Sequence, residues 1–88
     1  MEVTILDRDK RISVNLAGDL TTEDGVVVAV RVLDLSASGF RLVADDELLL
    51  GERVLLRIGR GDGMPATVKW VVGREVGGSF LQKAKTVL

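Results

Sequence analysis

The 88-residue chain is long enough for one small domain with a single core, and its 47% hydrophobic content excludes an intrinsically disordered chain. It contains neither cysteine nor histidine, which excludes disulfides, thiolate metal sites and the usual general base, and its N-terminus does not resemble a secretory signal. Its 12 basic and 13 acidic residues leave a net charge of −1, which argues against a nucleic-acid partner, so we expect a cytoplasmic, metal-free, non-enzymatic module that does not insert into a membrane.

The first part of the chain predicts two strands. Apolar and polar residues alternate from residue 12, which indicates a half-buried strand with three inward residues: Ile12, Val14 and Leu16. We expect Gly18 and Asp19 to bend this strand and residues 21–25 to form a turn. Residues 26–35 are apolar on both faces except at Arg31 and Asp34, which predicts a long central strand.

The middle of the chain predicts two shorter strands. Residues 36–39 are typical of a turn, and residues 40–42 form a short third strand in which Phe40 belongs to the core. Residues 45–51 fit either one helical turn or a loop whose leucines plug the end of a barrel. Residues 53–58 alternate again and predict a fourth strand.

The last part predicts a closing hairpin. Residues 59–63 are a flexible connection without the features of a phosphate-binding loop. The next strand points four residues inward: Ala66, Val68, Trp70 and Val72. Residues 73–75 form a tight turn, and residues 76–81 return as the last strand, with Phe80 in the core.

About six strands joined by short turns, with no crossover helix, predict an all-β fold with an antiparallel sheet and little or no helix. The apolar face has no helix to cover it, so the sheet closes into a small barrel. We expect a flexible arm over residues 1–10, the barrel over residues 11–81 and a tail over residues 82–88.

Two polar clusters carry candidate chemistry. Asp34 and Ser36 lie two residues apart and share the strand face that carries apolar residues earlier in the strand, while Gly39 allows a positive φ or a close approach to a ligand. An aspartate accepts two hydrogen bonds from the N1 and N2 edge of guanine, and a serine hydroxyl donates to a phosphate or a base. In the charged stretch of residues 7–11, an arginine can bind guanine, stack on a purine or pair with phosphate.

These residues resemble the PilZ family of bacterial cyclic di-GMP receptors. Residues 34–39, Asp-Leu-Ser-Ala-Ser-Gly, match its D/N-x-S-x-x-G motif, and the charged arm leading into residues 11–16 is similar to its basic arm and first strand. Residues 51–54 look like its loop into the fourth strand, and residues 68–71 and 78–80 look like its closing hairpin. The resemblance covers residues 7–81 and implies an antiparallel barrel of about six strands.

The resemblance also implies a ligand site. Asp34, Ser36 and Gly39 match the motif residue by residue, and Arg11 matches the second arginine of the family's R-x-x-x-R arm. Asp7 stands in place of the first arginine, and Arg8 is its nearest substitute. Two further candidates for ligand binding are Lys10 and Ser38.

The leading expectation is a non-enzymatic receptor whose arm closes over cyclic di-GMP in second-messenger signalling and changes the surface offered to an unknown protein partner. The alternative is a degenerate PilZ-like adaptor that binds a protein and no nucleotide. Two structural interpretations stay open beside them: residues 34–39 as a simple hairpin connection, and residues 7–11 as a solvated arm whose charges pair internally.

Overall fold

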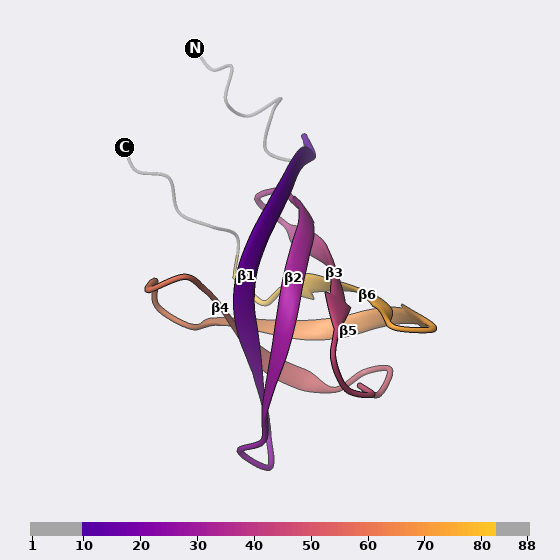
Figure 1. Cartoon of the computed structure of the whole chain (residues 1–88). Coiled ribbons are helices and arrows are strands. Elements are labelled where there is room, and N and C mark those ends of the chain that lie inside the picture. Colours follow the sequence, from indigo (N-terminus) through magenta and orange to yellow (C-terminus); the bar gives the residue numbers. More distant parts are fainter. Residues whose placement is uncertain (1–9, 83–88) are drawn as a thin grey trace.

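The computed structural model describes residues 10–82, which form six β-strands and contain no helix that could cross a membrane (Figure 1). The strands are β1 (Ile12–Thr22), β2 (Val27–Leu35), β3 (Gly39–Ala44), β4 (Arg53–Ile58), β5 (Met64–Val72) and β6 (Glu75–Phe80). All pairings are antiparallel, and the order β1-β2-β3-β6-β5-β4 closes because β4 pairs back with β1. The expected small antiparallel barrel of about six strands is confirmed.

The core fills the inside of this barrel with side chains from every strand. Six of them are fully buried and large: Leu20, Leu42, Leu56, Val32, Val68 and Val76. The rings of Phe40 and Phe80 lie with their centroids 5.5 Å apart and close the core at the end where β3 begins and β6 ends, as expected for two core aromatics.

The start of one expected turn was wrong: the turn expected over residues 21–25 begins only after Thr22, with Gly25 at a φ of 88°. β1 continues through Gly18 and Asp19. Of the two interpretations of residues 45–51, the structure has the loop. One of its leucines, Leu48, is buried, whereas Leu49 and Leu50 are exposed.

The expected faces were wrong where a strand carries a β-bulge. Such a bulge adds one residue to a strand, so that residues beyond it point to the opposite face. In β2, Val32 pairs with Leu42 but Asp34 already pairs with Arg41, which makes Leu33 the extra residue. Alternation predicts that Asp34 shares the inward face of Val32, but the bulge turns Asp34 to the other face. It lies on the barrel exterior opposite Arg41.

A second bulge, between Val68 and Trp70 in β5, has the same effect on the tryptophan. Trp70 was expected in the core, but it lies outside with 37% of its surface exposed, and Val72 is exposed as well. β1 carries a third irregularity between Ser13 and Leu16. Two apolar residues of β1 that were expected to be inward, Ile12 and Leu16, are 59% and 39% exposed.

Candidate ligand-binding site

The predicted site residues that the structure describes lie at one end of the barrel. Ile12 pairs with Leu35 and Ser13 with Asp34. Arg11, which directly precedes β1, therefore lies beside the turn that joins β2 to β3. Figure 1 shows the start of β1 and this turn at the same end of the molecule, opposite the β1–β2 turn. Lys10 and Arg11 are exposed, and within residues 10–82 neither has an ion-pair partner. Arg8 lies outside the described residues.

Asp34 is held by two side chains from neighbouring strands. Its Oδ2 accepts a hydrogen bond from Arg41 Nε at 2.5 Å, and its Oδ1 accepts a longer one from the Ser13 hydroxyl at 3.5 Å. Only 13% of the Asp34 side chain is exposed. Asp34 is therefore a fixed acceptor in the free barrel, and its Oδ1 has the weaker of the two partners.

Arg41 continues this network to β6. Its Nη1 lies 3.2 Å from Glu75 Oε2, so one guanidinium binds two carboxylates. The hydrogen bond to Asp34, more than any other contact, raises the pKa of Arg41 above its ordinary value, so this contact favours the cationic guanidinium. Arg41 and Glu75 were not among the predicted site residues.

Ser36 organises the turn between β2 and β3. Its backbone N–H donates to Gly39 O at 2.9 Å, and its hydroxyl oxygen accepts from the N–H groups of Ser38 and Gly39 at 3.3 and 3.1 Å. Within residues 10–82, the hydroxyl donates a long hydrogen bond of 3.4 Å to Gly39 O and lies 3.4 Å from Ser38 Oγ, where either hydroxyl can be the donor. Ser36 thus caps its own turn, as a simple hairpin connection requires, and keeps a weakly bound hydrogen that can turn to a ligand.

Gly39 is required for packing between strands. Its φ is not positive, so the positive φ allowed by the sequence is not used. A Cβ at this position would overlap the backbone oxygen of Gly78 in β6. The glycine therefore lets β3 and β6 approach each other beneath the turn.

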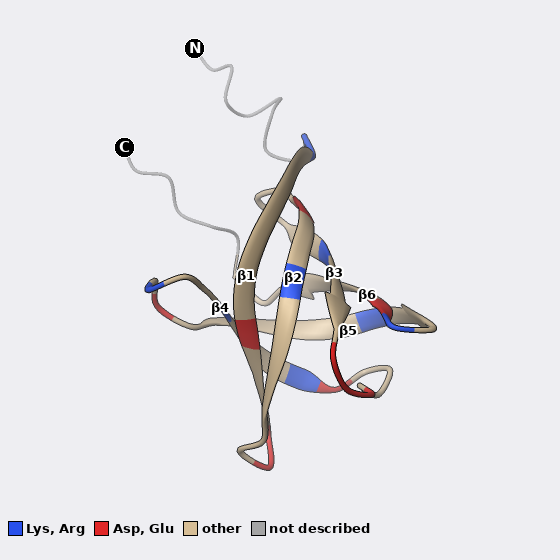
Figure 2. Ribbon diagram, viewed as in Figure 1, with Lys and Arg blue, Asp and Glu red and all other residues tan. Residues whose placement is uncertain are grey.

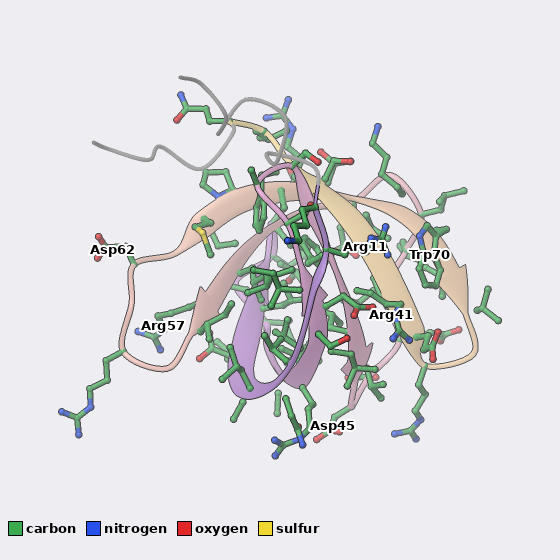
Figure 3. All side chains as sticks on the ribbon, turned by 90° about the horizontal axis from the view of Figure 1, so that it is seen from above. Arg11, Arg41, Asp45, Arg57, Asp62 and Trp70 are labelled. Atoms are coloured by element: carbon green, nitrogen blue, oxygen red, sulfur yellow. The ribbon has the colours of Figure 1, made fainter. Side chains whose placement is uncertain are left out.

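The exterior surface continues from Arg41 to an aromatic ring. Arg41 and Trp70 both pair with Gly77, on its two sides. A Cβ at Gly77 would overlap the indole, so Trp70 packs directly on the glycine backbone. Figure 3 shows Arg41 and Trp70 on the same side of the barrel, away from Arg57 and Asp62. A row across five strands results: Ser13, Asp34, Arg41, Gly77 and Trp70.

The arrangement offers acceptors, a hydroxyl and cations where β1 begins beside the β2–β3 turn. An aromatic ring lies two strands beyond Arg41, on the same side of the barrel. Basic and acidic residues are interspersed over the described strands and turns (Figure 2). Such a surface can recognise a small ligand that has donor-bearing bases and phosphates more readily than an extended polyanion.

Comparison with known proteins gives one decisive result. The sequence profile of the PilZ domain matches residues 6–86 of the 88-residue chain. The chain belongs to the PilZ family. PilZ domains are binding and adaptor domains of the cyclic di-GMP signalling type, generally without enzymatic activity. A search of the curated proteins found no significant match to this PilZ domain.

Sequence reasoning missed Arg41, Glu75 and the outward position of Trp70. The position of Arg41 could have been predicted, because a turn over residues 36–39 places Leu35 opposite Phe40 and Asp34 opposite Arg41. The position of Glu75 could not have been predicted, since its place beside Arg41 depends on the pairing of β3 with β6, which are far apart in the sequence.

Proposed function

We propose that this PilZ domain is a non-enzymatic receptor for cyclic di-GMP and that the nucleotide binds where the arm enters β1 beside the β2–β3 turn. The observation that carries the proposal is the pairing of Ile12 with Leu35. This pairing brings Arg11, which matches the second arginine of the family's arm, next to the motif of residues 34–39. An arm and a motif at opposite ends of the barrel would have argued against it.

The proposed roles follow from the chemistry of each side chain. Asp34 accepts hydrogen bonds from the N1 and N2 edge of a guanine through Oδ1, whose hydrogen-bond donor among residues 10–82 is the Ser13 hydroxyl at 3.5 Å. Ser36 turns its weakly bound hydroxyl hydrogen to the ligand. Arg11 binds a guanine edge or a phosphate, and Lys10 adds positive charge.

Trp70 supports the proposal as an additional surface. Its indole packs against Gly77, and 37% of the residue is exposed on the same side of the barrel as Arg41. A purine can stack on such a ring, and aromatic–base stacking contributes about 1–3 kcal/mol per base. It is the only tryptophan of the chain, so its fluorescence reports on this surface.

Isothermal titration calorimetry with two cyclic dinucleotides tests the proposal. We expect binding of cyclic di-GMP with a Kd in the micromolar range or below, and at least about tenfold weaker binding of cyclic di-AMP, because adenine has no N1–H and N2 donors for Asp34. Arg11→Ala should abolish binding, and Arg60→Ala, which removes an exposed arginine from the turn between β4 and β5, serves as its control. Equal binding of both nucleotides would refute the role of Asp34.

A second candidate function is the adaptor that binds a protein without nucleotide. Two observations favour it: Asp7 stands where the family arm has its first arginine, and Arg41 already occupies one oxygen of Asp34. The exposed Ile12 and Leu16 at the start of β1 would then contribute to the protein surface. No heat and no fluorescence change at several hundred micromolar cyclic di-GMP would favour this adaptor.

A further inference from the structure

Arg41 stands between two acidic groups at the edge of the proposed site. It donates to Asp34 through Nε at 2.5 Å and to Glu75 through Nη1 at 3.2 Å. Asp34 belongs to the PilZ motif, whereas Glu75 belongs to β6 and matches no motif residue. Glu75 therefore determines what else the guanidinium of Arg41 can bind, although it is not itself a proposed contact of the nucleotide.

The three groups carry one positive and two negative charges, a local excess of −1. A cyclic dinucleotide brings two phosphate charges to the neighbouring surface, and like charges that meet without an intervening cation oppose binding. The side chains of Arg41 and Glu75 are 31% and 44% exposed, so water screens this repulsion only in part. Neutralising Glu75 would remove the excess and release Nη1 of Arg41.

We propose that Glu75 lowers the affinity of the domain for cyclic di-GMP by keeping Arg41 bound within the protein. When glutamine replaces Glu75, the Arg41 guanidinium becomes a phosphate-binding cation. The proposal rests on cyclic di-GMP binding at the site described above. Arg41 would then supply a guanidinium to a PilZ domain whose arm has Asp7 in place of its first arginine. Glu75 thereby sets the ligand concentration at which the domain responds.

Calorimetric titrations of Glu75→Gln with cyclic di-GMP test this proposal. The matched control is Glu23→Gln, which removes the same charge from an exposed residue in the β1–β2 turn, at the opposite end of the barrel. We expect Glu75→Gln to lower Kd by about threefold to tenfold and Glu23→Gln to change it by less than about twofold. The gain should shrink when salt rises from about 0.05 M to 0.5 M.

The double variant Arg41→Gln/Glu75→Gln separates a released arginine from a simple loss of negative charge. If Arg41 mediates the effect, the double variant loses the gain of Glu75→Gln. A gain that survives without Arg41 overturns the proposal. So does an unchanged Kd in Glu75→Gln when the unmodified protein binds normally, an outcome that leaves the proposed function intact. Absence of binding in every variant, with all of them folded by circular dichroism, refutes both.

Discussion

At the scale of single residues, the motif of this PilZ domain stabilises the β2–β3 turn through its own contacts, independently of any ligand. Ser36 accepts two backbone N–H groups in its own turn, and Gly39 clears the space that the Gly78 carbonyl occupies. The sequence pointed to these residues as a ligand site or as a hairpin connection. The observed contacts are those of a hairpin connection, and the ligand role that we propose would add to them.

Gly39→Ala should therefore destabilise the protein in the absence of any nucleotide. The added methyl group overlaps the backbone of β6, and forced overpacking of this kind costs about 1–3 kcal/mol. Gly63→Ala is the control, because the atom nearest to its Cβ would be Cβ of Leu55, at an ordinary contact distance of 3.5 Å. Urea denaturation measures both. Equal stability of the two variants would contradict the packing role of Gly39.

At the scale of elements, strand positions were predictable and strand faces only partly so. Alternating patterns located β4 correctly, with Val54 and Leu56 inward. Beyond the bulges at Leu33 and between Val68 and Trp70, however, the pattern assigned Asp34 and Trp70 to the wrong face. A bulge is set by pairing with the neighbouring strand, so alternation along one strand contains no signal for it.

The outward position of Trp70 predicts a small stability effect. Trp70→Ala removes a ring that packs on Gly77 from outside, so we expect a loss below about 2 kcal/mol rather than the roughly 3–5 kcal/mol of a buried tryptophan. Leu42→Ala, in the centre of the core with 0% exposure, should cost about 2–5 kcal/mol. Thermal unfolding followed by circular dichroism compares them. A larger loss for Trp70→Ala than for Leu42→Ala would show that the ring belongs to the core.

At the scale of the whole molecule, closure of the barrel followed from composition and spacing. With short turns and no helix, the apolar face had no other cover. The partners that close it, β3 with β6 and β1 with β4, are separated in the chain, so local patterns could not name them. The contact between Arg41 and Glu75 depends on the first of these pairings, and for that reason the surface beside the motif was only half predictable.

A closed barrel with a single core should unfold in one cooperative step. Each strand pairs on both sides, so removal of one strand exposes the core to which the others contribute. Urea transitions followed by far-ultraviolet circular dichroism and by Trp70 fluorescence should coincide. Separate midpoints would show that the surface around Trp70 opens independently of the barrel.

Backbone amide chemical shifts during a titration with cyclic di-GMP give the sharpest test of nucleotide binding beside the β2–β3 turn, because they map the ligand on the barrel residue by residue. We expect shifts at Arg11 and residues 34–41, reduced by Asp34→Ala and abolished by Arg11→Ala. Resonances of the β1–β2 turn, around Gly25 at the opposite end, should stay in place. Shifts that gather at that turn, or none at several hundred micromolar nucleotide, would contradict binding beside the β2–β3 turn.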